Sequence, residues 1–286
     1  NPGIGIHHHF RADAGLAAHG APGAHPDRPA VRHPHHSTSP GIHPGAPAPG
    51  RDGTGSIAAA GLASRREAEA WIREGRVSLN GRAVTELGTR ADPDTDIIRV
   101  DGRRLGRPER RVALLLNKPR GFLSTCSDPE KRPTVLALIP GIRERLYPVG
   151  RLDFASEGLL ILTNDGELAL AVTHPRNRCR KVYRVKVRGI PSEETLRRVS
   201  RGIVLEGRKT LPATVTRIRS EKNAWLEVTL TEGRKTQIRQ VFERVGHTVL
   251  KLKRIRIGGI GDRGLAPGAW RALTDSEIRS LKGGAA

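Results

Sequence analysis

A short apolar run in the middle of the chain, Leu159 to Leu162, constrains the fold more than any other stretch. It has the length of a buried β-strand, and the turn-forming sequence Thr-Asn-Asp-Gly follows it, ending at Gly166. The loop before it contains Asp153, so the sequence places a carboxylate just ahead of a buried strand. A loop aspartate usually caps its own turn. The alternative is a catalytic carboxylate flanked by Arg151, a pair that covalent chemistry at a sugar carbon can use.

Charge is the second constraint. The 286 residues include 50 Lys and Arg against 29 Asp and Glu, a formal net charge of +21 at pH 7. A surplus of this size favours a polyanionic partner such as a nucleic acid. Aromatic residues make up only 3% of the chain, so the core must consist mainly of Leu, Val, Ile and Ala. The length fits one or two domains.

Cysteine usage and hydropathy limit the class of protein. Cys126 and Cys179 are far apart and form no closely spaced ligand pair, so we expect no disulfide framework, no zinc site and no cofactor. The longest apolar runs have four or five residues, far short of a bilayer span, and no signal-peptide pattern occurs at the start. The sequence therefore predicts a soluble, cytoplasmic protein without a membrane partner.

Residues 1–50 differ in composition from the rest of the chain. They hold nine of the eleven histidines, with many Pro and Gly residues and no hydrophobic period. This composition predicts a disordered tail. The sequence contains no methionine, so we expect that the natural start is missing or that the upstream segment is not natural coding sequence.

Residues 51–104 carry the signals of a small module. Ser64 stands three positions before Glu67, a capping-box pattern, and apolar residues follow at helical spacing. A helix is therefore predicted from Ser64 to about Gly75. Asn80 and Gly81 then predict a turn between two short strands, and IIRVDG supplies a further strand.

This order of elements, with SRR opening a helix and GRV and LNG closing it, resembles the RNA-binding module named after ribosomal small-subunit protein four. The resemblance runs from about Ile57 to Arg103 and implies a basic helix that contacts RNA, whereas a solvated basic face is the plainer alternative. At Arg51–Ser56 the sequence RDGTGS replaces the basic, leucine-rich first helix of that module, so we expect a truncated or irregular first helix. The implied RNA contacts are Ser64, Arg65, Arg66, Arg73 and Arg76.

Residues 105–111 are interpreted as a basic linker and residues 112–286 as a larger domain. Strands are predicted in VALLL, RKVYRVKVRG, LPATVTRIRS, AWLEVTLTEG and TVLKLKRIRIGG, and helices in RPTVLALIP, from Ser192 to Arg201, over 235–245 and after Thr274. In RKVYRVKVRG the residues alternate, which places Tyr183 on one face and Arg184 on the other. Many sequential strands with few helices favour an α+β fold, a mostly antiparallel mixed sheet with flanking helices.

The motif around Asp153 belongs to a longer series. LYPVGRLDFASEGLLILTNDGELA is followed by HP, KVYRVKV, TEGRKTQIRQV and HTVLKLKRIRIG, in this order. The series resembles the RsuA/RluB family of ribosomal RNA pseudouridine synthases over roughly Ile57 to Leu281. The resemblance implies isomerisation of uridine to pseudouridine in ribosomal RNA, and the FLSTCSDP stretch gives a slight preference for large-subunit RNA. It implies Asp153 as the catalytic residue, Tyr183 as a ring stacked near the target base, Arg239 as the basic partner of Asp153, and Arg151 as an RNA contact. Lys118, in the basic turn NKPRG, is also expected to contact RNA.

Two positions depart from the family pattern. Ser156-Glu157-Gly158 stands where the family usually has TEGL, which exchanges one hydroxyl for another. Gln240 stands where a basic residue often follows the paired arginine, which removes a secondary RNA contact. The target base must leave its helix to react, and the carboxylate can attack the sugar or abstract a proton to give a glycal. The sequence leaves these two routes open.

Two other classes of protein are compatible with parts of the pattern. A noncatalytic RNA-binding or ribosome-assembly protein would explain the charge and the first module, but not the combination of Asp153, Tyr183 and Arg239. A carboxylate glycosidase would need a second catalytic acid, for which Glu157 is the near candidate. We expect ribosomal RNA as the partner, no obligate protein partner, and a monomer.

Overall fold

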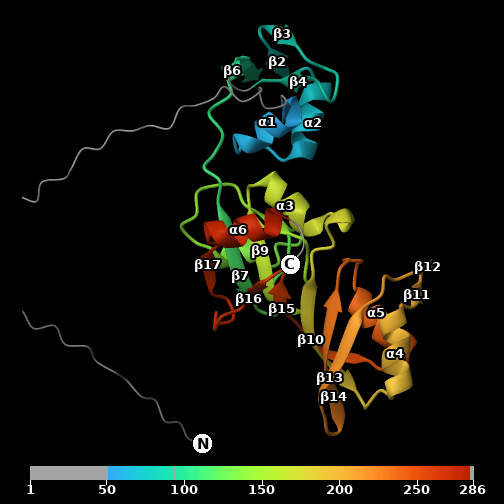
Figure 1. The fold of residues 1–286 in the computed structure, drawn as a ribbon. Coiled ribbons are helices and arrows are strands. Elements are labelled where there is room, and N and C mark those ends of the chain that lie inside the picture. Colours follow the sequence, from blue (N-terminus) through green and yellow to red (C-terminus); the bar gives the residue numbers. More distant parts are fainter. Residues whose placement is uncertain (1–50, 93–94, 284–286) are drawn as a thin grey trace, which may run out of the picture. The chain divides into compact units, whose positions relative to one another are not determined.

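The structure is a computed structural model that describes residues 51–92 and 95–283. The predicted tail, residues 1–50, lies outside the described residues. In chain order, the described part contains a small module of two helices and short strands, followed by a larger part organised on one nine-stranded sheet (Figure 1). No helix in these two ranges is long and apolar enough to cross a membrane.

Two helices open the small module. The first, α1 (Gly53–Ala59), has seven residues, none of them basic, which agrees with the expected shortening of this helix. The second, α2 (Arg65–Arg73), begins after Ser64, whose Oγ accepts the Glu67 N–H at 3.2 Å. The Glu67 carboxylate in turn accepts the Ser64 N–H at 2.7 Å, which confirms the predicted capping box.

Short strands complete the module. Asn80 and Gly81 have φ angles of 52° and 84°, as a tight hairpin turn of the type favoured by Asn-Gly requires. They join β2 to β3, and the same small sheet continues through β5 and β6. The bounds are β1 (Arg51–Asp52), β2 (Val77–Leu79), β3 (Arg82–Ala83), β4 (Arg90–Ala91), β5 (Ile98–Val100) and β6 (Arg103–Arg104).

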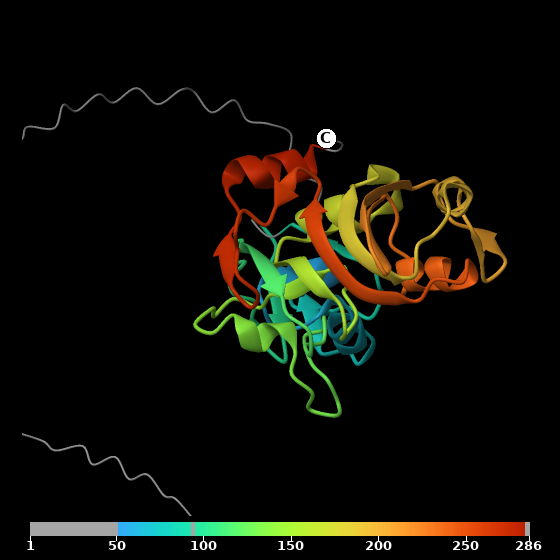
Figure 2. The ribbon, with the colours of Figure 1, turned by 90° about the horizontal axis from the view of Figure 1, so that it is seen from below.

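The larger part is built on a sheet with the strand order β13-β14-β10-β15-β9-β7-β17, and β8 and β16 pair at its side. Figure 2 shows the yellow and orange strands of this sheet curving side by side. Among the strands named in the described ranges, β15 and β9 form a parallel pair and the other pairs are antiparallel. This arrangement confirms the predicted α+β class. The bounds are β7 (Ala113–Lys118), β8 (Tyr147–Val149), β9 (Glu157–Thr163), β10 (Lys181–Arg188), β13 (Thr214–Ser220), β14 (Asn223–Leu230), β15 (Val249–Ile257), β16 (Ile260–Gly261) and β17 (Trp270–Ala272), with a separate hairpin of β11 (Val204–Leu205) and β12 (Arg208–Lys209).

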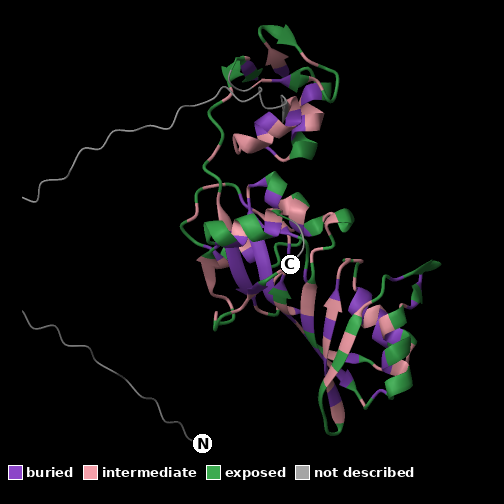
Figure 3. Cartoon of the chain, viewed as in Figure 1, coloured by how far each residue is buried: buried purple, intermediate pink, exposed green. Residues whose placement is uncertain are grey.

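Alternation along the strands decides which side chains form the core. On β10, Tyr183, Val185 and Val187 pack in one cluster with residues of α4 (Glu193–Arg201) and α5 (Gln237–Arg244). The strand β9 is different because both of its faces are buried, as Figure 3 shows for this part of the sheet. Leu159 packs toward α3 (Gly166–Thr173) and α6 (Asp275–Lys282), whereas Leu160 packs toward the 3₁₀ helix η1 (Val135–Leu138). The buried strand predicted after Asp153 is confirmed.

The segment after β9 contains a helix that the sequence pattern did not predict. Thr163 to Gly166 was expected to form a turn, but Asp165 is the N-cap of α3, and its Oδ1 accepts the N–H groups of Glu167 and Leu168 at 3.0 and 3.3 Å. Turns and helix N-caps use the same short polar side chains, so the local pattern does not separate them.

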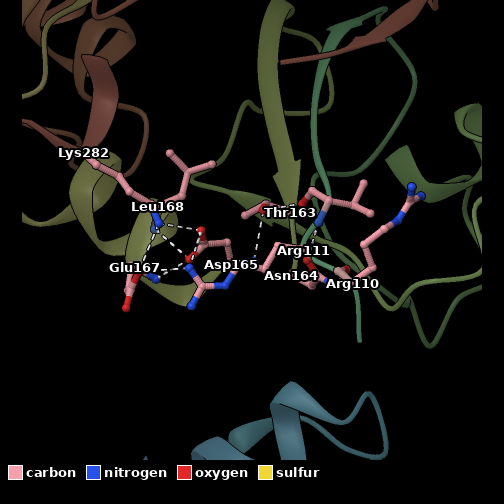
Figure 4. Close-up of polar contacts among 9 residues, drawn as sticks. Arg110, Arg111, Thr163, Asn164, Asp165, Glu167, Leu168 and Lys282 are labelled. Atoms are coloured by element: carbon pink, nitrogen blue, oxygen red, sulfur yellow. Dashed lines mark hydrogen bonds and ion pairs between the residues drawn. The ribbon is translucent and has the colours of Figure 1, made fainter. Parts of the chain in front are cut away.

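Asp165 also joins the two ends of the larger domain (Figure 4). Lys282, in the last turn of α6, lies 2.7 Å from Asp165 and 3.0 Å from Glu167, and Arg111 lies 3.6 Å from Asp165. Burial alone would raise the pKa of the Asp165 carboxyl, but the bond and charge of Lys282 and the Leu168 N–H hold it below its usual range. This cluster attaches the C-terminal helix to the end of the central buried strand.

Candidate active site

The loop between β8 and β9 presents Asp153. Gly150, with φ +75°, turns the chain out of β8. The backbone of the buried Leu152 is then fixed by Ser124, whose Oγ accepts the Leu152 N–H at 3.1 Å and donates to its carbonyl oxygen at 2.9 Å. The turn is closed by the backbone, because the Ser156 N–H donates to the Asp153 carbonyl at 2.9 Å. Within the described ranges the Asp153 carboxylate caps no backbone N–H, unlike that of Asp165, and its side chain is 38% exposed.

Arg239 reaches this loop from the first turn of α5. Its Nε lies 3.6 Å from Asp153 Oδ2, so the predicted pairing of the two residues is present. Its other nitrogens donate to the Ser156 hydroxyl and to the Val249 carbonyl, both at 3.3 Å. Three contacts, two on the Asp153 loop and one on β15 (Val249–Ile257), hold the guanidinium in one orientation. The hydroxyl of Ser156 is used directly, which explains why Ser can stand where the family usually has Thr.

Lys118 is buried, and its predicted contact with RNA is wrong. As part of the basic NKPRG turn it was expected to contact RNA, but its side chain is fully buried at the end of β7. Its Nζ donates to the carbonyls of Pro119, Asp153 and Ser156 at 3.0, 3.2 and 2.8 Å. The three N–H groups of one ammonium thus meet three carbonyls, two of them in the Asp153 loop. Lys118 is a clamp on this loop and is not available to RNA.

Burial has an electrostatic consequence for Lys118. Desolvation lowers the pKa of its amine to about 8, although the negative charges of Asp153 and Glu157 oppose this shift. Glu157 itself pairs with the half-exposed Arg120 at 2.9 Å. A second buried cation, Arg254 on β15, also disfavours a charge on Lys118.

Tyr183 approaches the site through the sheet. In register it lies opposite Arg254 of β15, and Arg254 lies opposite Gly158 of β9, so one row across three strands leads from the tyrosine to the Asp153 loop. Tyr183 is 8% exposed and shares a hydrophobic cluster with Leu152. The ring therefore forms a wall beside the loop, with little of its surface open.

Gly158 makes the close approach of β9 and β15 possible. A Cβ at this position would lie 2.1 Å from the Arg254 carbonyl oxygen, and its φ of +109° is in the region that favours glycine. The Arg254 Nε donates to the Leu159 carbonyl at 2.6 Å, and its buried Nη2 has no hydrogen-bond partner within the described ranges. No sequence pattern distinguishes Arg254, because its strand reads simply as basic and apolar.

Phe154 is the other site residue that was not predicted from the sequence. It follows Asp153 directly, its carbonyl accepts the Gly121 N–H at 2.9 Å, and its side chain is 47% exposed. A large aromatic residue between an aspartate and an alanine in a predicted loop is the signal that was available. Arg151 is also exposed, and no ion pair of its guanidinium occurs among the residues that the structure describes.

The predicted RNA contacts of the small module differ in availability. Ser64 is occupied as the cap of α2, and Arg65 pairs with Asp52. Arg76 is committed within the protein, because it binds Asp101 at 2.7 and 2.9 Å and lies over the Trp71 ring at 4.9 Å. The exposed residues with the fewest contacts are Arg66, for which the described ranges show no ion pair, and Arg73, with a 3.8 Å contact to Glu69.

No group of three or more His, Cys, Asp or Glu side chains that could hold a metal ion occurs in residues 51–92 and 95–283. The site itself combines a carboxylate paired with a guanidinium, a loop held by a buried amine, and an aromatic wall. A carboxylate held in this way is suited to nucleophilic or basic attack on a sugar.

Two family models match the chain in these regions. Residues 112–244 match the model described as RNA pseudouridylate synthase, and residues 56–97 match the S4 domain. The fold and the site thus define an enzyme of the pseudouridylate synthase class that carries an S4 module. The chain belongs to the RNA pseudouridine synthase family, and the resemblance to its RsuA/RluB branch is confirmed.

Named relatives and a solved structure agree with this assignment. The chain is 45% identical over 227 residues to an uncharacterized RNA pseudouridine synthase of Aquifex aeolicus, covering 79% of this chain and 91% of that protein. It is 44% identical over 229 residues to ribosomal large subunit pseudouridine synthase B of Bacillus subtilis, covering 79% and 93%. A crystal structure of a pseudouridylate synthase superposes with a TM-score of 0.59 at 30% identity, covering 80% of this chain and 99% of that chain. The chain is an isomerase, and the alternatives of a glycosidase and of a noncatalytic protein are set aside.

Proposed function

We propose that this enzyme converts uridine to pseudouridine in ribosomal RNA, with a preference for large-subunit RNA, and that Asp153 is its catalytic residue. The observation that carries the proposal is the Asp153 carboxylate, 38% exposed, with Arg239 Nε 3.6 Å away and its loop held by Lys118. The named function of the Bacillus subtilis relative supports the choice of RNA, and the net charge of +21 suits a polyanionic substrate.

The reaction breaks one bond and forms another at the same sugar carbon. The bond from C1′ to N1 of uracil is cleaved, the base turns, and C1′ bonds to C5, which loses its hydrogen while N1 gains a proton. Asp153 serves either as the nucleophile at C1′ or as the base that forms a glycal. Both routes use the carboxylate itself, and Arg239 Nε lies 3.6 Å from its Oδ2.

The other residues take positioning and binding roles in this proposal. Lys118 holds the backbone of the loop on both sides of Asp153, and Arg239 orients the carboxylate. Tyr183 forms a wall beside the extruded base, and the exposed ring of Phe154 and the exposed guanidinium of Arg151 contact the flanking RNA. In the S4 module, Arg66 and Arg73 are the best-placed phosphate contacts.

The domain limits remain part of the proposal, with a tail at 1–50, an RNA-binding module at 51–104, a linker at 105–111 and a catalytic domain at 112–286. We further propose that the enzyme works as a monomer without an obligate protein partner, in the cytoplasm where its RNA substrate is made.

Asp153→Asn is the direct test. The substitution keeps the shape of the side chain and removes its charge and its nucleophilic oxygen, so the variant should bind RNA but form no pseudouridine. Because C5 loses its hydrogen, release of tritium from RNA that contains 5-tritiated uridine measures the reaction. Rapid tritium release by purified, folded Asp153→Asn protein would exclude the proposed role of Asp153.

A further inference from the structure

The sheet of the catalytic domain has a second face that the proposed chemistry does not use. Side chains of β10 alternate, so Tyr183 and Val185 point into the core with α4 and α5, and the residues between them point the other way. Because Arg239 of α5 holds Asp153 from the core side, the active site and this second face lie on opposite sides of β10. We call it the open basic face and define it by Arg184, Lys186, Arg188, Trp225, Lys251 and Lys253, all exposed or half-exposed.

The strand register places like charges beside one another on the open basic face. Lys186 lies opposite Lys251, and Arg184 lies opposite Lys253, both between β10 and β15. Neighbouring strands are about 4.8 Å apart, so these cations are close neighbours. Like charges directly opposite in a sheet destabilise it. The folded protein thus keeps two repulsive pairs side by side, which a bound polyanion would neutralise.

The protein supplies few counter-charges to this face. Lys253 pairs with Asp262 at 3.5 Å. In contrast, Arg184, Lys186 and Lys251 form no ion pair and no side-chain hydrogen bond with any described residue, although Glu227 is the register neighbour of Arg184 on β14. The cations are therefore available to an external anion.

An aromatic side chain stands among these charges. Trp225 of β14 lies opposite Lys186 in register, and the Lys186 Nζ is 5.7 Å from the centre of the indole ring. The row across the strands is thus Trp225, Lys186, Lys251. A half-exposed indole offers a stacking surface to an unpaired base, and the lysines beside it suit the adjoining phosphates. Cations that repeat every second residue along β10 are about 7 Å apart and form a ladder along the strand.

We propose that the open basic face binds single-stranded RNA, as a second contact site on the side of the sheet away from Asp153. The inference rests on RNA being the substrate of the proposed function. When the enzyme binds its substrate, the RNA segment that flanks the target uridine would pass over the edge of the sheet onto this face. The face would supply affinity and leave the chemical step unchanged.

The experiment measures binding of fluorescent poly(uridine) to the full chain over a range of salt concentrations. In the variant with Lys186→Gln and Lys251→Gln, two phosphate contacts are lost, so the slope of log affinity against log salt should fall by about 1.4. By the same relation, affinity should fall about 25-fold at about 0.1 M salt. The matched control carries Arg197→Gln and Arg198→Gln on α4, an equal change of charge on exposed residues of the helix side, and should bind like the wild type.

Trp225 gives an independent arm. Trp225→Ala should weaken binding more than Trp225→Phe, with the salt slope unchanged in both, because stacking releases no counterions. Urea unfolding checks the fold, and the lysine variant should be at least as stable as the wild type because its repulsive pair is gone. Unchanged affinity and slope in the lysine variant, or an equal loss in the α4 control, would overturn the inference. In either of these cases, normal tritium release by the wild-type protein would show that the proposed function still holds.

Discussion

A substitution of Arg239 should affect the rate of the reaction much more than the stability of the protein. Its guanidinium contacts Asp153, Ser156 and Val249, so it pairs with the proposed catalytic carboxylate and joins α5, the Asp153 loop and β15. Arg239→Gln removes the charge and the fork of donors but keeps a polar side chain on α5. We expect a large fall in kcat and a small fall in stability, because the two effects depend on different properties of the same contacts.

The structure sets the size of each effect. The Arg239 and Asp153 side chains are 29% and 38% exposed, so solvent screens the ion pair, and its net contribution to stability is about 1 kcal/mol or less. The two hydrogen bonds at 3.3 Å are long and contribute about 0.5 kcal/mol each. The free energy of unfolding should therefore fall by about 2 kcal/mol. Loss of one oriented electrostatic contact at a reacting group costs on the order of 100-fold in kcat, or about 2.7 kcal/mol.

Tritium release under saturating and limiting RNA gives kcat and KM, and urea unfolding gives the stability. KM should change little, because the Arg239 guanidinium is already committed to Asp153, Ser156 and Val249 within the protein. Arg244→Gln on the same helix is the matched control, since Arg244 is exposed and makes no ion pair with any described residue. Asp153→Asn combined with Arg239→Gln should be no slower than Asp153→Asn alone, as for residues that act as a unit. A folded Arg239→Gln enzyme with kcat near the wild-type value would refute the reasoning.

Three further outcomes are expected. Tyr183→Leu should lower the rate of tritium release about 5- to 150-fold, from about 1 to 3 kcal/mol of lost stacking, and Tyr183→Phe should not; equal rates would reduce Tyr183 to a core residue. Because the pKa of Lys118 is lowered to about 8 in the folded state, the unfolded chain binds more protons above that value, so wild-type stability relative to Lys118→Met should rise between about pH 8 and 10.5. Urea unfolding measures this difference in stability between the two proteins, and a difference that stays constant over this pH range would contradict the lowered pKa of Lys118. Gly158→Ala should destabilise the protein by about 3 kcal/mol or more, because its Cβ would meet the Arg254 backbone at a φ of +109°, whereas Gly75→Ala, at φ +71° with open space around it, should cost about 1 kcal/mol.

The sequence alone determined the features that depend on near neighbours in the chain. The capping box of Ser64 and Glu67 joins residues three apart, and the hairpin at Asn80 and Gly81 depends on two residues that tolerate positive φ. The period of two in β10 separates the core face from the basic face, because successive side chains of a strand point to opposite sides. The order of motifs around Asp153 was long enough to indicate the family and, through it, the partnership with Arg239.

Only the tertiary structure decided which side chains are available and what they contact. Lys118 lies in a basic turn, yet three backbone carbonyls from two segments surround its amine, and this burial depends on how β7 and β9 pair. Phe154 is a site residue because the Asp153 loop leaves its ring exposed. Arg254 is one because the parallel pairing of β9 and β15 places it opposite Gly158. The like charges of the open basic face become neighbours only through the register of β10 and β15, because residues about 65 positions apart in the chain meet when the sheet forms.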